Sequence, residues 1–261
     1  YDVESSLNVF LEYTMLDSHP LEPYFGFTEK EVQKLCKRYK MNFDETKRWY
    51  DGYHLTKETS IYNPKAVAES MRRKMFNVYW TQTGAFDVLK DYINMDFEGL
   101  QDAISQMIVG EHYPVDTTGF NTSLEIRDKN DVLTALIHLG YLTYDFETKV
   151  AWIPNEEIRS VMQTAITESN WSHTIKQFQR SRDFMAAIQN KDADMAAQII
   201  EEIHDDISVP IHYHSEGDLT TTLLFATNEA RNYCILSREC PSSRGYADIV
   251  LIPTKPSWYK P

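Results

Sequence analysis

The chain has 261 residues, of which 42% are hydrophobic and 25% are charged. A chain of this length can bury a sizeable core and is expected to form one to three domains. Its net charge of −13 argues against a protein that coats DNA non-specifically, because such binding depends on basic residues that release counterions. A local basic face, or a metal ion that bridges protein and phosphate, is still compatible with this charge.

The ends of the chain and its cysteines bear on where the protein works. The sequence contains no run of about 18 apolar residues, and Tyr1 is not followed by a basic segment and an apolar stretch, so we expect neither a transmembrane helix nor a signal peptide. An initiator methionine is absent, which suggests a piece of a longer protein. Cys36, Cys234 and Cys240 show no C-x-x-C spacing, which favours a reducing cytoplasm over a disulfide framework or a structural zinc site.

The first part of the chain contains clear helix-start signals. Thr28 and Glu31 have the spacing of a capping box, and an apolar stripe follows them. Asp44 is expected to cap a short helix that Gly52 ends. Asn63 followed by proline predicts a helix that continues to about residue 73. Two more helices are predicted over 85–93 and 97–108.

A helix, two strands and a second helix are predicted between residues 131 and 166. The helix ends at Gly140, the strands surround a turn at Glu147, and Asn155 caps the second helix. This order is that of the end of a winged-helix module. A β-hairpin packed in an α+β core is the alternative, since Lys149 is the one cation of the turn and a DNA-reading wing usually carries more.

The second part of the chain begins with helices and ends with a hairpin. Residues 171–207 are predicted to form two helices with a break at 190–192, and another helix is expected over 218–231. Strands are predicted over 232–239 and 246–253. The apolar run from Ile249 to Ile252 indicates a strand that is buried on both faces.

Two carboxylates in this second part are candidate ligands of a metal ion. Asp248 precedes the apolar run, where an ionised side chain is costly unless it is paired or binds a cation. Glu216 lies at the start of the preceding helix, and carboxylates are the ligands that Mg²⁺ prefers. Alternatively, Asp248 caps the loop or pairs with Arg244, and Glu216 only stabilises the positive end of its helix.

Two further signals are weaker. His212 and His214 lie close to Glu216 in sequence and could contribute to a zinc site, although two histidines in a polar loop are more often solvated. Arg238 and Arg244 flank the proposed site and could contact phosphate, but ion pairing with a neighbouring glutamate also accounts for them.

Several segments together resemble one family, the AAA-ATPase-like proteins that carry a C-terminal domain of the PD-(D/E)XK nuclease superfamily. The resemblance covers nearly the whole chain, and its segments are 27–32, 49–53 (WYDGY), 61–64 (IYNP), 79–84, 139–142, 154–159 (PNEEIR), 215–219, Glu239 and 243–249 (SRGYADI).

The resemblance implies an α+β fold and a division of the chain. Residues 1–27 would be the tail of the ATPase-like core, 28–170 a helical lid with a winged-helix-like region, and 171–261 a helical linker with the first half of an α/β nuclease-fold domain. Glu216 and Asp248 match two of the acidic positions that gather around Mg²⁺ or Mn²⁺ in such nucleases. The implied partner is nucleic acid, most simply DNA, and ATP would bind only through a core that precedes this chain.

The chain departs from the family pattern in two places. It contains no G-x-x-x-x-G-K-[ST] phosphate loop, and no E-x-K follows Asp248. We therefore expect the chain to be inactive by itself. Alternatives are a non-catalytic regulatory or interaction module, and an accessory region of an AAA-type ATPase. An unpaired sheet edge beside the Asp248 strand would also permit self-association.

Overall fold

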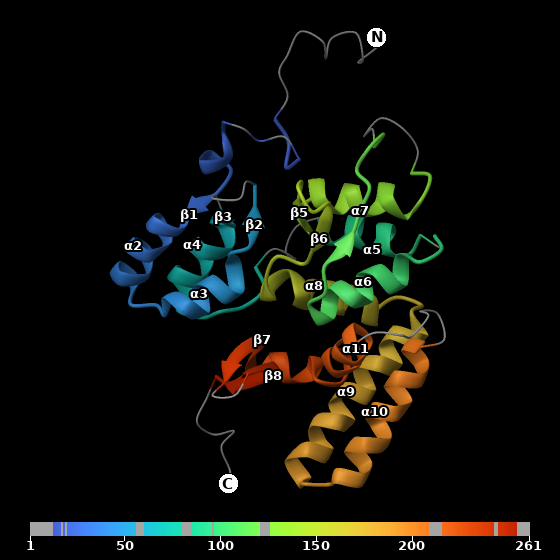
Figure 1. Cartoon of the computed structure of the whole chain (residues 1–261). Helices are drawn as coiled ribbons and strands as arrows, with labels where there is room; N and C mark the ends of the chain where they lie inside the picture. Colours follow the sequence, from blue (N-terminus) through green and yellow to red (C-terminus); the bar gives the residue numbers. More distant parts are fainter. Residues whose placement is uncertain are drawn as a thin grey trace. The chain divides into compact units, whose positions relative to one another are not determined.

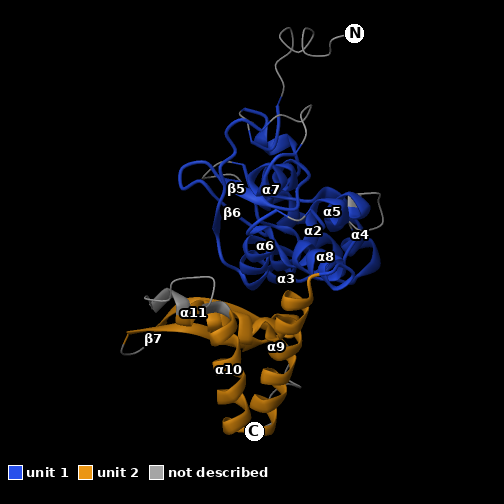
Figure 2. Ribbon diagram, turned by 90° about the vertical axis from the view of Figure 1, so that its right-hand side faces the viewer, with its two compact units in different colours: residues 1–170 blue, residues 171–261 orange. Residues whose placement is uncertain are grey.

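The computed structural model describes residues 13–16, 18, 20–55, 60–79, 85–95, 97–120, 126–208, 216–242 and 245–254. The chain is mixed α+β, with many helices and small antiparallel sheets (Figure 1). It divides into two compact units, residues 1–170 and 171–261, which Figure 2 colours separately. In the described residues no helix is both long and apolar enough to cross a membrane.

Unit 1 contains two 3-stranded sheets surrounded by helices. Its elements are a 3-10 helix Glu22–Tyr24, β1 Phe27–Thr28, α2 Glu29–Tyr39, α3 Phe43–Tyr50, β2 Tyr53–His54, β3 Ser60–Tyr62, α4 Pro64–Arg73, α5 Ala85–Ile93, α6 Leu100–Val109, β4 Tyr113–Pro114, α7 Lys129–His138, β5 Thr143–Asp145, β6 Val150–Trp152 and α8 Glu156–Thr167.

The helix starts of unit 1 follow local capping chemistry. The backbone N–H of Thr28 donates to Glu31 Oε2 at 2.8 Å, which confirms the predicted capping box of α2. Asn63 Oδ1 accepts from the N–H of Ala66 at 3.1 Å, and α4 runs to Arg73 as predicted. The predicted cap of α3 was wrong: Asn42 rather than Asp44 holds the first turn, because α3 begins one residue before Asp44.

The two sheets of unit 1 are short and antiparallel. The first has the order β1-β3-β2, with Ile61 opposite Thr28 on one side and Tyr53 on the other. The second has the order β4-β6-β5, with Ala151 at its centre opposite Tyr113 and Tyr144. The first sheet is continued by a core that helices α2, α3 and α4 fill, with Tyr50, Tyr62 and Val67 fully buried among them.

The predicted helix, two strands and helix between residues 131 and 166 are present as α7, β5, β6 and α8. The strands are shorter than expected, with three residues each. All seven residues from Asp131 to Ile137 are buried, so α7 is enclosed on every side. A helix enclosed in this way cannot insert into a DNA groove, which favours a hairpin packed in a core over a DNA-reading wing.

Unit 2 consists of helices and a long hairpin. Its elements are α9 Ser172–Asn190, α10 Ala193–Ser208, α11 Glu216–Ala226, a 3-10 helix Asn228–Asn232, β7 Cys234–Ser242 and β8 Gly245–Pro253. The predicted break lies at Lys191, which has a left-handed backbone (φ 59°) and separates α9 from α10. The helix predicted over 218–231 is interrupted at Thr227, where the 3-10 helix replaces its last part.

Polar side chains join the elements of unit 2. The buried Ser181 of α9 donates through Oγ to the carbonyl of Ala226 at 2.9 Å, and it accepts from the N–H of Glu229 at 2.8 Å. On the other side of α9, Arg180 forms ion pairs with Glu202 and Asp206 of α10. At the base of the hairpin, Thr254 Oγ1 donates to the carbonyl of Tyr233 at 2.8 Å. These contacts join the helices of unit 2 to one another and close the base of the hairpin.

Candidate functional site

The hairpin of unit 2 places two carboxylates at matching positions of its strands. Arg238 pairs with Ile249 and Cys240 pairs with Ala247, so Glu239 and Asp248 hold the intervening position of the register, although they do not themselves form a pair. Like charges at neighbouring positions of two strands repel each other. Glu239 has a left-handed backbone (φ 49°), which marks a local distortion of β7 at this position.

Neither carboxylate forms an ion pair with a described residue. Asp248 and Glu239 are both exposed, and no ion pair or side-chain hydrogen bond involves either of them in the part of the chain that the structure describes. Two carboxylates on neighbouring strands are oxygen ligands of the kind that a hard divalent cation binds. Glu239 is one of the positions of the resemblance, but of the two only Asp248 was predicted as a ligand, and the strand register adds Glu239 to it.

The surroundings of Asp248 differ from the prediction. No residue of β8 is buried, and Ile252 is 48% exposed, so the expected strand buried on both faces was wrong. The physical reason is that, among the described residues, β7 and β8 pair only with each other. Asp248 is therefore not forced to bind a cation by burial, and the case for a metal site depends on Glu239 instead.

The remaining predicted site residues are placed only in part. Glu216 begins α11, but its side chain lies outside the described structure, as do Arg244, His212 and His214. Arg238 is exposed on β7, next to Glu239 in sequence. Among the described residues no group of three or more His, Cys, Asp or Glu side chains could hold a metal ion. The structure thus places Asp248 and Glu239 at matching register positions of β8 and β7. The side chain of Glu216 lies outside the described residues.

Comparisons of the chain with protein-family models, with curated proteins and with solved structures give no match.

Several segments of the resemblance meet in unit 1, at a junction between α3 and α8. Asn155 Nδ2 donates to the carbonyl of Asp51 at 2.8 Å, and Asn155 Oδ1 caps α8 by accepting from the N–H of Ile158 at 3.1 Å. Gly52 (φ 106°) packs against the carbonyl of Pro154 so closely that a Cβ would overlap it. The WYDGY and PNEEIR segments therefore form a structural contact with each other.

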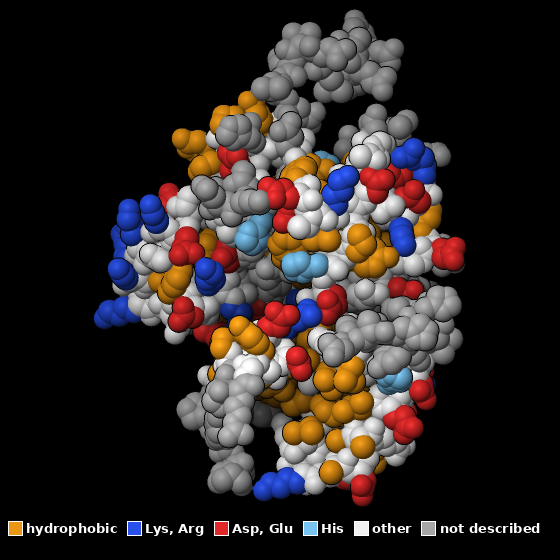
Figure 3. Space-filling view, viewed as in Figure 1, with side chains coloured by type: hydrophobic (Ala, Val, Ile, Leu, Met, Phe, Trp, Pro, Cys, Tyr) orange, Lys and Arg blue, Asp and Glu red, His pale blue; other side chains and the backbone are white. Residues whose placement is uncertain are grey.

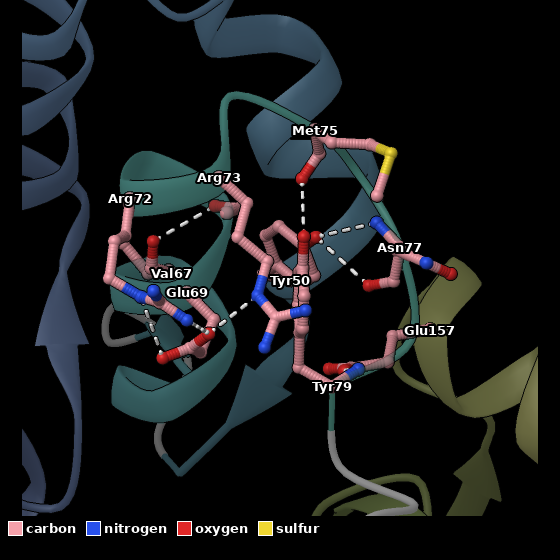
Figure 4. A network of polar contacts seen from close by, with 10 residues as sticks. Tyr50, Val67, Glu69, Arg72, Arg73, Met75, Asn77, Tyr79 and Glu157 are labelled. Atoms are coloured by element: carbon pink, nitrogen blue, oxygen red, sulfur yellow. Dashed lines mark hydrogen bonds and ion pairs between the residues drawn. The ribbon is translucent and has the colours of Figure 1, made fainter.

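A buried carboxylate extends this junction. Glu157 is completely buried and accepts at Oε1 from the N–H of Tyr79 at 2.6 Å, as Figure 4 shows. In the same view the hydroxyl of Tyr50 donates to the carbonyl of Asn77 at 3.0 Å. Burial raises the pKa of Tyr53 and of Tyr50 well above the ordinary value, and the Glu157 carboxylate adds to both shifts. The hydroxyls of Tyr50 and Tyr53 therefore stay protonated and hold the fold together. They are poor candidates for acid-base chemistry.

An aromatic groove of about 480 Å³ lies between the two sheets of unit 1. Its lining includes His54, Tyr144, Phe146 and Trp152, together with the carboxylates of Asp145 and Glu147. The ring of Trp152 also stacks on His112, with centroids 4.4 Å apart. Aromatic rings of this kind can stack on nucleobases, but two acidic residues in the lining oppose an approaching phosphate. The groove is therefore not a favourable surface for nucleic acid.

Proposed function

We propose that this chain belongs to an ATPase-linked, Mg²⁺-dependent nuclease-fold protein that acts on nucleic acid, and that unit 2 supplies carboxylate ligands for the metal ion. The observation that carries the proposal is the placement of Asp248 and Glu239 at matching register positions of the hairpin, both exposed and without an ion pair to a described residue. The order α11, β7, β8 supports it, since the resemblance implies a helix with an acidic residue followed by a strand with an aspartate. Glu216, the first residue of α11, is the third ligand that we propose.

The donor set fits the cation. Mg²⁺ is usually held by one or two carboxylates together with water and substrate phosphate oxygens, and it polarises a scissile phosphate and activates an attacking water. Asp248 and Glu239 are exposed, so a phosphate can reach an ion that they hold. The 261 residues contain no E-x-K after Asp248, so we expect metal binding but no cleavage by this chain.

Binding of Mn²⁺, followed by electron paramagnetic resonance, tests the proposal. We expect the chain to bind one ion, and Asp248→Asn and Glu239→Gln each to weaken binding by about tenfold or more. Asp194→Asn is the matched control, because Asp194 is an exposed aspartate at the start of α10. Without metal, Asp248→Asn should stabilise the hairpin by about 0.2–1 kcal/mol, since it removes the repulsion from Glu239. Equal binding by wild type and the Asp248 variant contradicts the proposal.

A second candidate function, an interaction module, is favoured by two exposed apolar residues near the base of the hairpin. Ile235 and Ile252 lie opposite each other and are 40% and 48% exposed. A two-stranded hairpin is marginal in water without a further strand or a covering layer. We propose a second copy of the chain as the partner that pairs with this edge. Sedimentation should then show concentration-dependent dimers that Ile252→Lys abolishes, and a monomer at all concentrations contradicts this function.

A further inference from the structure

Positive charge gathers in one segment of unit 1, although the whole chain is acidic. Residues 29–74 contain twelve Lys and Arg residues and seven Asp and Glu residues, whereas the whole chain has 26 and 39. The rest of the chain is therefore more acidic than the total suggests. Such segregation creates a local positive field that the net charge conceals.

The centre of this charge is one side of α2. Lys30, Lys34 and Lys37 follow at intervals of four and three residues, so they lie on the same side of the helix, and all three are exposed. The opposite side carries Val32 and Cys36, which are buried against α3 and α4. Figure 3 shows Lys and Arg side chains gathered over the part of unit 1 where Figure 1 draws α2. We call Lys30, Lys34 and Lys37 the basic face.

The lysines of the basic face are not used in ion pairs. Of the acidic residues of α2, Glu29 pairs with Lys47 of α3 at 3.0 Å, and Glu31 is held by the capping box. Lys34 is near enough to help lower the pKa of Glu31, after the hydrogen bonds from Thr28. No ion pair is formed by the three lysines with any described residue. By contrast, the neighbouring arginines of α4 both pair with a single glutamate.

Helix stability does not explain this pattern. A cation in the last turn of a helix interacts favourably with the macrodipole, which accounts for Lys37 and Arg38. Lys30 lies in the first turn, where the same dipole makes a cation unfavourable. The helix dipole therefore does not account for Lys30.

Three more cations extend the positive surface toward α4. Lys74, the residue after α4, donates through Nζ to the carbonyl of Tyr39 and lies 5.0 Å from the centre of its ring. The guanidinium of Arg38 lies 5.7 Å from the same ring. Lys40 ends α2 in a left-handed conformation and is exposed. Cations therefore lie along α2 and at its end, and Lys74 at the end of α4 contacts Tyr39, the last residue of α2.

The chemistry of this basic surface indicates the class of partner that it binds. No large hydrophobic side chain of α2 is exposed, so the helix lacks the apolar face that a membrane surface requires. Each strand of a nucleic acid carries one charge per about 3.4 Å of axis, and lysines three to four residues apart on a helix are separated by about 4.5–6 Å of rise. We propose that the basic face of α2 binds the phosphate backbone of a nucleic acid. The inference shares only the partner class with the proposed function and stands on a different surface.

Salt-dependent binding to DNA tests the proposal. The probe is a fluorescein-labelled oligonucleotide of about 20 nucleotides, single- or double-stranded, in EDTA so that no metal site contributes. The variant Lys30→Gln/Lys34→Gln/Lys37→Gln removes the basic face. Its matched control is Lys176→Gln/Arg182→Gln/Lys191→Gln, which neutralises three exposed cations of unit 2 that form no ion pair with described residues.

We expect anisotropy to show binding by wild type and by the control, and much weaker binding by the α2 variant. The slope of log K against log salt should fall in magnitude by about 2 for single-stranded and about 3 for double-stranded DNA. Asp248→Asn should leave this binding unchanged, so failure here is distinguishable from failure of the metal site. Three results would each overturn the proposal. They are equal losses of DNA affinity in both triple variants, absence of DNA binding by wild type, and competition by polyglutamate as strong as by unlabelled DNA.

Discussion

Gly52 is the residue at which the backbone of unit 1 is least replaceable. Its φ of 106° is outside the range that side-chain-bearing residues normally adopt, and an added Cβ would lie 2.8 Å from the carbonyl carbon of Pro154. The glycine lets the segment after α3 approach the segment before α8. That approach in turn brings Asp51 within hydrogen-bonding distance of Asn155.

Gly52→Ala should therefore destabilise unit 1 by about 3 kcal/mol or more, because it adds a backbone overlap to an unfavourable φ. Gly119→Ala is the matched control. Gly119 has a φ of 80°, but the nearest atom to an added Cβ is a guanidinium nitrogen of Arg127 at 4.0 Å. Gly119→Ala should lower the free energy of unfolding by only about 1–2 kcal/mol. Urea denaturation measures the free energy of unfolding of both variants. Equal losses of stability would show that Pro154 moves aside readily.

At the scale of elements, α8 owes its start and its attachment to one side chain. Asn155 caps the helix through Oδ1 and binds the carbonyl of Asp51 through Nδ2, so it joins α8 to the end of α3. The residue after Asn155 begins a helix whose Ile158, Met162 and Ile166 are buried. The cap and the contact between elements are therefore coupled.

Substitutions at Asn155 can separate the two roles. Asn155→Ala removes both hydrogen bonds and should cost about 2–3 kcal/mol of unfolding free energy. Asn155→Ser keeps a capping oxygen but is too short to reach Asp51, so it should cost about 1 kcal/mol. Thermal unfolding followed by circular dichroism gives the comparison. A serine variant as unstable as the alanine variant would mean that the cap contributes little.

Local signals predicted the helices well, and they failed where the outcome depends on distant segments. Asn63 before a proline and Asn155 before acidic residues specify caps through atoms two or three residues away. The burial of β8 depends instead on what covers it, which an apolar run cannot reveal. The matching positions of Glu239 and Asp248 likewise follow from the register of the hairpin. For the candidate site, the sequence therefore predicted Asp248 but not its partner.

At the scale of the whole molecule, charge and burial are distributed unevenly between the parts of the chain. The enclosed helix α7 offers no face to a DNA groove, whereas α2 presents lysines to solvent at a distance in sequence from the wing-like hairpin. The proposed phosphate contacts and the proposed metal ligands consequently belong to different units, α2 to unit 1 and the hairpin to unit 2. Each proposal can then be tested by variants that leave the other unit unchanged.

Buried tyrosines are also unevenly distributed. Among the described residues, burial raises the pKa of five tyrosines in unit 1 and of one in unit 2. Those of unit 1 are Tyr50, Tyr53, Tyr62, Tyr79 and Tyr141, and that of unit 2 is Tyr233. The values reach about 12 for Tyr141 and for Tyr233, compared with an ordinary value of 10.0. Burial also raises the pKa of the Cys234 thiol in unit 2.

These shifts predict that alkaline pH destabilises unit 1 more than unit 2. A raised pKa in the folded state means that the folded protein retains the proton more tightly than the unfolded chain does. The contribution of each tyrosine to stability is therefore fully present below about pH 10. It is lost as pH rises toward about 12, because the unfolded chain ionises first.

In calorimetry, the transition of unit 1 should move further to low temperature between about pH 8 and about pH 11 than that of unit 2. Tyr141→Phe should reduce the pH dependence of the first transition, and Tyr233→Phe that of the second. Equal shifts of both transitions, or a Tyr141→Phe protein with an unchanged pH dependence, would contradict a role for buried tyrosines in the alkaline unfolding of unit 1.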